Sequence, residues 1–247
     1  MKYGVFSDVH GNLEAFEVAL ARLQKEGAEK YIFCGDLIGY GPDPQACVKL
    51  YRELAEKDQV FGVKGNHDAL QTHPELQTYF HLDALAVGEW SLGKLSENSL
   101  RCISFLPEIV RGPNFTLVHG TPGDPIKEYF SSREQYRRFY THWAGEVLFV
   151  GHTHIAMYMK GNETSCEVHA AKEPQTISLQ TPFRYVINPG SVGRPRDYDA
   201  RAAFGVWDIT AHTFSFLREA YDLQKTQAKM RLCGLPDFLI KTLPLGM

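Results

Sequence analysis

Five short polar motifs in this chain each begin where a run of apolar residues ends. The motifs read SDVHGN, CGD, KGNHD, VHG and VGHTH, and the apolar runs before them lie at residues 3–7, 31–34, 60–63, 115–118 and 147–150. Short apolar runs bounded by turn residues predict buried β-strands. In an open α/β sheet, ligands bind at the carboxyl ends of the strands, so the motifs are expected to converge at one edge. This requirement restricts the chain to a largely parallel sheet with one polar edge.

Helical patterns lie between several of these strands. Apolar residues recur at helical spacing from Leu13 to Leu23, and Gly27 is placed to end that helix. Further helices are expected at residues 45–56 and 131–142. Strands that alternate with helices predict βαβ units and an α/β fold.

Two regions differ from this alternation. Residues 70–106 are rich in Leu, Ala, Glu and Gln and predict two or three helices inserted beside the sheet. A strand is expected at 185–187, and alternating runs at 203–209 and 213–220 predict antiparallel strands, which give the second half α+β character. No repeat or linker interrupts the chain, so residues 1–247 are expected to form a single domain.

The charge of the chain does not indicate a nucleic-acid or membrane partner. The formal net charge is -3, which gives no indication of a nucleic-acid surface or of binding to an anionic membrane. The N-terminus has no apolar signal core and no later run is long enough to cross a bilayer, so a cytoplasmic protein is expected.

The five cysteines are scattered without a C-x-x-C pair, so reduced thiols are expected instead of disulfides or a zinc site. The tail begins helical, and its apolar stretch at 235–245 is a candidate contact for a homo-oligomer.

The residues of the motifs are of types that bind metals. They offer two carboxylates, one amide oxygen and four imidazoles: Asp8, His10, Asp36, Asn66, His119, His152 and His154. Asp8 and His10 are two residues apart, as are His152 and His154, and in an extended segment each pair would share one face. Nitrogen and oxygen ligands without a thiolate favour Mn, Fe, Co or Ni, and Zn also fits. Seven ligands exceed what one ion normally takes, so two divalent metal ions that share a carboxylate are expected, with manganese favoured.

A structural role for these residues is the alternative. Buried Asp and His are costly unless they are paired or bound to metal, which makes that alternative the weaker one.

The order D-x-H, G-D, G-N-H-D, H, G-H-x-H resembles the calcineurin-like metallophosphoesterase superfamily, from Asp8 to at least His154. The turns GDLIGYGPDP and NPGSVGRPRD resemble a bacterial branch of small members. The resemblance implies two mixed β-sheets packed as a sandwich and flanked by helices. It assigns one metal ion to Asp8, His10 and His154, and the second to Asn66, His119 and His152, with Asp36 as the bridge.

The resemblance also implies hydrolysis of phosphoester bonds in a small phosphate-containing substrate, most of all a phosphodiester or a nucleotide or dinucleoside polyphosphate. Two metal ions can activate water and offset phosphoryl charge, so a hydroxide held between them beside Asp36 is expected to attack phosphorus. His67 is expected to give its proton to the leaving oxygen, and Asn66 to contact the substrate as well as a metal.

Two positions depart from the family pattern. Many relatives, including the protein Ser/Thr phosphatases, carry Asp and Arg shortly after G-D, where this chain has Gly39 and Tyr40. The Asp that orients the catalytic His is therefore missing, and so is the Arg that holds phosphate. A phosphomonoesterase or protein phosphatase thereby becomes the second alternative. A non-catalytic scaffold is a third, although such relatives tend to lose ligands that this chain retains.

The turn NPGSVGRPRD offers two arginines to a substrate. Arg194 and Arg196 are expected to bind phosphate through the bidentate guanidinium fork if this turn approaches the metal ligands. In the alternative, both arginines pair with Asp197 or Asp199. Two alternatives remain for the inserted helices at residues 70–106. They either cap the substrate or pack among themselves.

Overall fold

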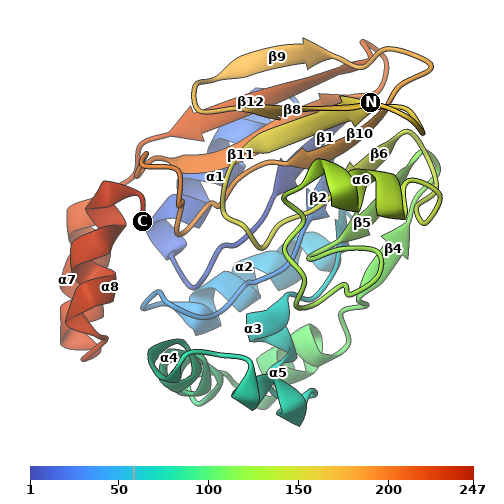
Figure 1. Ribbon diagram of the computed structural model, residues 1–247. Helices are drawn as coiled ribbons and strands as arrows, with labels where there is room; N and C mark the ends of the chain where they lie inside the picture. The colour runs from blue at the N-terminus through green and yellow to red at the C-terminus, as the bar shows by residue number, and fades with distance from the viewer. Residues whose placement is uncertain (58) are drawn as a thin grey trace.

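The computed structural model describes residues 1–57 and 59–247, and two mixed β-sheets of six strands each form its centre (Figure 1). The first sheet has the order β3 (Val60–Gly62), β2 (Lys30–Phe33), β1 (Lys2–Phe6), β11 (Ala202–Asp208), β12 (Thr213–Glu219) and β9 (Gln175–Ser178). The second has the order β4 (Ile109–Arg111), β5 (Phe115–Val118), β6 (Val147–Phe149), β10 (Arg184–Asn188), β7 (Met157–Gly161) and β8 (Cys166–Ala170). The expected fold class is confirmed.

The parallel part of each sheet carries the polar motifs. β1 pairs with β2 and β2 with β3 in parallel, and so do β5 with β6 and β6 with β10. The later strands β11 and β12 join β1 in antiparallel pairing. This arrangement directs the carboxyl ends of the motif-bearing strands to one side of the molecule.

An aromatic core lies between the sheets, and helices cover their outer faces. The rings of Phe115 and Phe149 pack edge to face on Trp207, with centroids 5.8 and 5.4 Å from it. On the first sheet, α1 (Leu13–Lys25) and α2 (Pro44–Ala55) bury a second core, in which the ring centroids of Phe6 and Phe16 lie 5.3 Å apart. α6 (Arg133–Phe139) packs on the second sheet.

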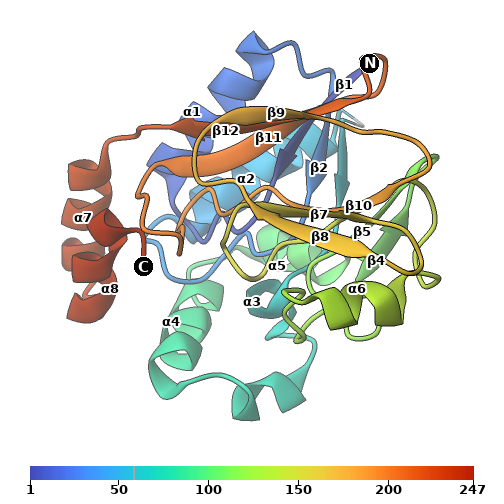
Figure 2. The ribbon, with the colours of Figure 1, turned by 45° about the horizontal axis from the view of Figure 1, so that its top comes forward.

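The inserted segment is helical, as expected for residues 70–106. It contains the 3-10 helix η1 (Pro74–Thr78), α4 (Leu82–Leu92) and α5 (Glu97–Ser104), and the short helix α3 (Asn66–Ala69) directly precedes it. α5 packs on α2, and α4 projects away from the sheets beside the C-terminal helices (Figure 2).

The C-terminal tail folds back onto the rest of the chain. It forms α7 (Leu223–Leu232), α8 (Asp237–Thr242) and the 3-10 helix η2 (Leu243–Leu245). Leu239 and Leu243 are buried with Val87 of α4, and Tyr40 packs against the same cluster. In the apolar stretch considered for an oligomer contact, Leu235, Leu239, Ile240 and Leu243 are therefore buried within the chain, whereas Phe238 and Leu245 are exposed. Among the helices of the two described ranges, none is both long and apolar enough to cross a membrane.

Four strands were not predicted: β4, β7, β8 and β9. β4 has only three residues, and most side chains of β8 and β9 are exposed. β9 (QTIS) also lacks the alternation of apolar and polar residues by which a half-buried strand is identified, whereas β8 (CEVHA) does alternate and was overlooked.

Candidate metal centre

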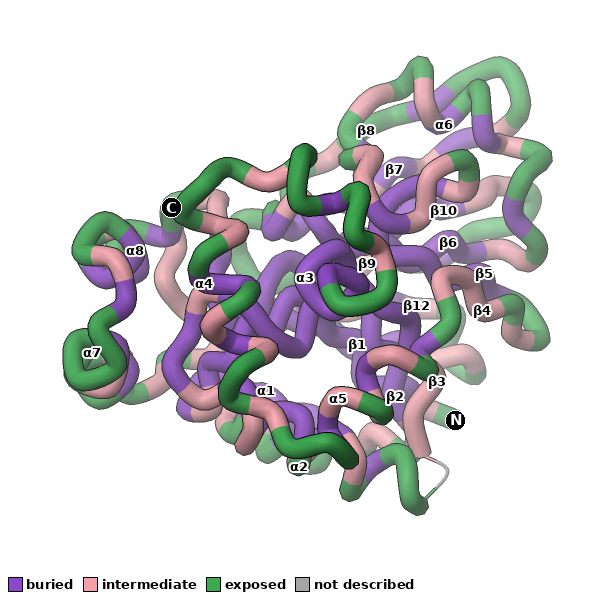
Figure 3. The backbone as a smooth tube through the Cα atoms, turned by 90° about the horizontal axis from the view of Figure 1, so that it is seen from below, coloured by how far each residue is buried: buried purple, intermediate pink, exposed green. Residues whose placement is uncertain are grey.

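The seven predicted ligands lie just beyond the ends of five strands, and all are buried. They follow β1 (Asp8 and His10), β2 (Asp36), β3 (Asn66), β5 (His119) and β6 (His152 and His154). The most exposed of them, Asn66, is only 4% exposed. It begins α3, which is buried along its whole length near the centre of Figure 3. The fold thus brings together residues that are up to 146 positions apart in the sequence.

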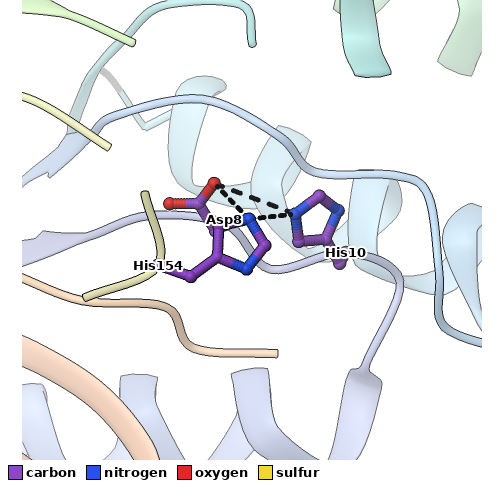
Figure 4. A group of neighbouring side chains, drawn as sticks. All are labelled: Asp8, His10 and His154. Atoms are coloured by element: carbon purple, nitrogen blue, oxygen red, sulfur yellow. Dashed lines mark hydrogen bonds and ion pairs between the residues drawn. The ribbon is translucent and has the colours of Figure 1, made fainter. Parts of the chain in front are cut away.

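Asp8, His10 and His154 form the first cluster (Figure 4). Nε2 of His154 lies 3.3 Å from Oδ1 of Asp8 and 3.1 Å from Nε2 of His10. These three ligand atoms all lie within 4.8 Å of one another, close enough to surround one ion.

Asp36, His119 and His152 form the second cluster. Nε2 of His119 lies 3.4 Å from Oδ2 of Asp36, 3.1 Å from Nδ1 of His152 and 3.2 Å from Oδ1 of Asn66. The same Oδ2 of Asp36 is 3.6 Å from Nε2 of His10 in the first cluster. Asp36 therefore lies between the two clusters, where a bridging carboxylate is expected.

Backbone carbonyls orient all four imidazoles. The ring nitrogen that points away from the clusters lies between 2.6 and 3.0 Å from a carbonyl oxygen: that of Ile38 for His10, Cys34 for His119, Lys127 for His152 and Arg194 for His154. Because a carbonyl only accepts, that nitrogen carries the proton. The other nitrogen then directs its lone pair into the cluster, as in metal-binding histidines.

Cations fit this arrangement. Within the described ranges, Oδ1 of Asp8 and Oδ2 of Asp36 are buried without a hydrogen-bond partner. Nε2 of His10 and Nε2 of His154, which face each other at 3.1 Å, would also oppose their lone pairs. Buried carboxylate oxygens and converging lone pairs are unfavourable unless positive charge lies among them. Nitrogen and oxygen atoms without sulfur suit Mn, Fe, Co, Ni or Zn.

The pKa shifts favour the protonation states that metal binding requires. Burial and, to a smaller extent, the charge of His119 lower the pKa of His152 to about 3. Burial also opposes ionisation of Asp8 and Asp36, but the neighbouring histidines outweigh it and hold both carboxyl pKa values below their usual range. His119 differs, because the carboxylate of Asp36 outweighs the effect of burial and raises its pKa to about 9. A metal ion at the second cluster would displace that proton.

The backbone at the ligands is left-handed, so the expectation of extended segments is wrong. The φ angles are 52° at Asp8, 50° at His10, 64° at Asp36, 66° at His152 and 60° at His154. The strands end before these residues, and each side chain is turned into the centre by a left-handed residue. Non-glycine residues adopt this conformation at a cost of roughly 1–2 kcal/mol each.

Asp68 is a site residue whose role the sequence did not reveal. Its carboxylate is fully buried and accepts the backbone N–H groups of Asp36 at 2.8 Å, Gly65 at 3.1 Å, Leu37 at 3.0 Å and Ile38 at 3.4 Å. Burial and the charge of Asp36 raise its pKa to about 7, and the N–H donors of Gly65 and Asp36 oppose the shift. Asp68 thus joins the turn that carries Asp36 to the turn that carries Asn66. Its place at the end of GNHD is the one sequence signal that pointed to it.

Ring packing, not a carboxylate, orients His67. Its imidazole lies with centroids 4.7 Å from Tyr40, 4.8 Å from Phe80 and 4.9 Å from His10. Within the described ranges its Nδ1 has no hydrogen-bond partner. Gly39 has φ +102°, and a Cβ there would lie 2.5 Å from that Nδ1. The position at which relatives carry an Asp therefore has no room for a side chain in this chain.

The alternative in which Arg194 and Arg196 pair with acidic residues of their own turn is wrong. Those carboxylates pair elsewhere, Asp197 with Arg218 and Asp199 with Arg201. Over residues 1–57 and 59–247, Arg194 and Arg196 have no ion pair of their own. The prediction that they contact substrate is not tested by this geometry and stays a prediction.

Both guanidinium groups flank Tyr40. Their central carbons lie 5.1 Å (Arg194) and 5.8 Å (Arg196) from the ring centroid. Arg196 donates to the Tyr40 hydroxyl at 3.3 Å, and its backbone N–H donates to the carbonyl of His154 at 3.1 Å. Arg194 donates to the carbonyl of Leu239 at 3.3 Å and to Oγ1 of Thr242 at 2.8 Å. The turn therefore adjoins the first cluster on one side and α8 on the other.

Residues 1–212 match the model of the calcineurin-like phosphoesterase superfamily domain. An uncharacterized protein of Methanocaldococcus jannaschii is 32% identical over 98% of this chain and 97% of its own. A bis(5'-nucleosyl)-tetraphosphatase of Oceanobacillus iheyensis is 32% identical over a shorter segment, 27% of this chain and 30% of its own. The solved structure of a metallophosphoesterase from Sphaerobacter thermophilus has a TM-score of 0.87 at 32% identity and covers 100% of this chain and 99% of its own.

These similarities extend well beyond the five motifs. The family model spans all seven predicted ligands and the described strands apart from β12, and the full-length relative includes the C-terminal helices. The resemblance inferred from the motifs is thereby confirmed, and the chain belongs to the calcineurin-like phosphoesterase superfamily.

Proposed function

We propose that the protein hydrolyses phosphoester bonds with two divalent metal ions, and that its substrates are phosphodiesters or nucleotide-type polyphosphates. The observation that carries the proposal is Asp36, whose partnerless Oδ2 lies between two clusters of imidazole nitrogens. Asp8, His10 and His154 would hold one ion, and Asn66, His119 and His152 the other, with Asp36 shared. When bound, the ions supply Lewis-acid activation of water and positive charge for the phosphoryl oxygens. Manganese is the proposed metal.

His67 is the proposed proton donor to the leaving oxygen. It is 2% exposed and adjoins both His10 and Asp36. Burial lowers the pKa of His67 to about 4, which leaves the ring neutral at neutral pH. An anionic phosphate bound beside it would favour the imidazolium form and so prepare the ring to donate a proton.

Arg196 is proposed to bind a phosphate of the substrate beyond the reacting one, a role distinct from that of the arginine that relatives carry after G-D. Tyr40 occupies that position, and its hydroxyl accepts a hydrogen bond from Arg196 of the later turn. Arg196 lies beside His154. Within the described ranges it forms no ion pair with a carboxylate, so its charge is available to a phosphate group. The partial similarity to a bis(5'-nucleosyl)-tetraphosphatase supports nucleotide polyphosphates among the substrates.

Metal-stripped protein is expected to be inactive toward bis-p-nitrophenyl phosphate and to gain activity with two equivalents of Mn²⁺. The measurement is the release of p-nitrophenolate against the number of ions bound. Faster turnover of the mono-aryl ester than of the bis-aryl ester would favour a phosphomonoesterase. Two bound ions with no hydrolysis of either ester would favour a non-catalytic scaffold.

Replacing His67 with alanine is expected to lower kcat by about 10²–10⁴ for a poor leaving group, and less for a good one. The physical reason is that phenolate needs protonation more than p-nitrophenolate does. The comparison is between diphenyl phosphate and bis-p-nitrophenyl phosphate at equal metal content. His73→Ala is a matched control, because His73 is paired with Glu108 away from the ligands. Equal losses on both esters would exclude His67 as the proton donor.

A further inference from the structure

A groove of about 340 Å³ lies between α4 and α8 beside the metal ligands. Its lining contains His81, Asp83 and Ala84 on one side, Phe238 and Leu239 on the other, and Tyr40, Arg194 and Arg196. Tyr40 connects the groove to the centre, because its ring centroid is 4.7 Å from those of both His10 and His67. Pockets that bind small organic ligands begin at about 300 Å³, so the groove is large enough for a ligand of nucleoside size.

The groove has an excess of positive charge. Arg194 is only 5% exposed, and its guanidinium donates to neutral oxygens of Leu239 and Thr242. Arg196 donates to the neutral hydroxyl of Tyr40. Two neighbouring arginines without a carboxylate partner in the described ranges are unfavourable by themselves, and an anion between or beside them would offset that charge.

The two helices that line the groove, α4 and α8, contribute apolar side chains and one carboxylate. Phe238 is 46% exposed on α8, although it belongs to a segment whose other apolar side chains are mostly buried. Leu239 and Ala84 extend this apolar lining. Asp83 of α4 is the acidic residue of the lining and can accept hydrogen bonds from hydroxyl or amino groups. A simple polyphosphate would leave Phe238 and Asp83 unused.

We propose that this groove, the α4–α8 groove, binds the part of the substrate that extends beyond the reacting phosphate, and that this part is a second phosphate joined to a nucleoside. The second phosphate contacts Arg196, the base lies against Phe238, and Asp83 accepts hydrogen bonds from the sugar or the base. Arg194 holds α8 in place and adds positive charge. The inference rests on the proposed function, since it assumes that the reacting phosphate lies at the metal centre.

The test compares two substrates in Mn²⁺-loaded protein. Diadenosine tetraphosphate carries a second phosphate and a base, and bis-p-nitrophenyl phosphate has neither. The ratio of their kcat/KM values is expected to fall about tenfold in Phe238→Ala, as for the loss of a base stacked on an aromatic ring. In Arg196→Gln the ratio is expected to fall about 10–100-fold, because a charge-assisted contact to phosphate is lost.

Two control variants remove similar side chains elsewhere. Phe105→Ala deletes a phenyl ring that is 83% exposed after α5, and Arg111→Gln deletes an exposed charge of β4, both outside the groove. Both controls are expected to keep the ratio within about twofold. Thermal unfolding identifies any variant that has lost its fold.

A binding measurement separates failure of the groove from failure of the enzyme. Calorimetry with α,β-methylene-ADP is expected to show about tenfold weaker binding in Phe238→Ala and in Arg196→Gln, and unchanged binding in both controls. This result would uphold the groove even if neither substrate were hydrolysed, which would refute the proposed function alone. Unchanged binding in both groove variants, with bis-p-nitrophenyl phosphate still hydrolysed, would overturn the groove and leave the proposed function standing.

Discussion

Asp36→Asn is expected to lower kcat/KM for bis-p-nitrophenyl phosphate by about 10³, because the two metal ions would lose a shared negative charge worth several kcal/mol in the transition state. The change is nearly isosteric. Oδ1 of Asp36 accepts the backbone N–H of His67 at 2.9 Å, and an asparagine can keep that bond. The charge at Oδ2, which lies 3.4 Å from His119 and 3.6 Å from His10, is removed.

The measurement is turnover together with metal content by mass spectrometry. Asp208→Asn is the matched control, because Asp208 lies opposite Lys2 in the register of β11 and β1, at the far end of the sheet from the ligands. The control is expected to keep its activity and both ions. A bridging role for Asp36 would be refuted if the asparagine variant bound two ions and retained more than about a tenth of the activity.

Asp68→Asn is expected to destabilise the fold by about 3 kcal/mol and to weaken metal binding, although Asp68 is not among the predicted ligands. Its two carboxylate oxygens accept four backbone N–H groups, and an amide nitrogen in place of one oxygen cannot accept. The two backbone N–H groups that share one carboxylate oxygen would then face the side-chain NH₂ group, which is also a donor, in a buried site. For a chain of this size the melting temperature should fall by roughly 6–12 °C.

A comparison with Asp197→Asn tests whether this effect is specific to the centre. Asp197 forms a buried ion pair with Arg218, so its replacement also destabilises the fold. Calorimetric titration with Mn²⁺ is expected to show weaker binding only in Asp68→Asn. Equal affinities in the two variants would mean that Asp68 stabilises the chain without positioning Asp36.

The sequence predicted that the seven candidate ligands would come together, because their signal is local. Each ligand lies directly beyond an apolar run, and the order of the runs is enough to bring Asp8, Asp36 and His119 to one edge of two sheets. The turn that carries the arginines was harder to interpret. Whether Arg196 faces a substrate or a neighbouring Asp depends on Arg218, a residue of β12 that competes for Asp197. No spacing along the chain reveals that competition.

Other features escaped because they depend on tertiary packing. The sequence identified Tyr40 only as a departure from the family pattern, yet its ring packs against His10, His67 and both arginines. The groove is formed by α4 and α8, which are about 150 residues apart in the chain and whose helical patterns do not specify a partner. Asp68 was hidden by its neighbours, because a GNHD motif directs attention to Asn66 and His67.

The left-handed backbone at five ligands limits how this centre can be transferred to another protein. Asn, Asp and His tolerate that conformation better than most residues, so Asp and His at these positions suit the backbone as well as the proposed metal ions. Grafting the same side chains onto regular strands or helices would aim them along different vectors. A designer would have to copy the turns, with the carboxylate of Asp68 that joins two of them, before the ligands could meet. For this centre the transferable unit is therefore the set of loops, not the set of side chains.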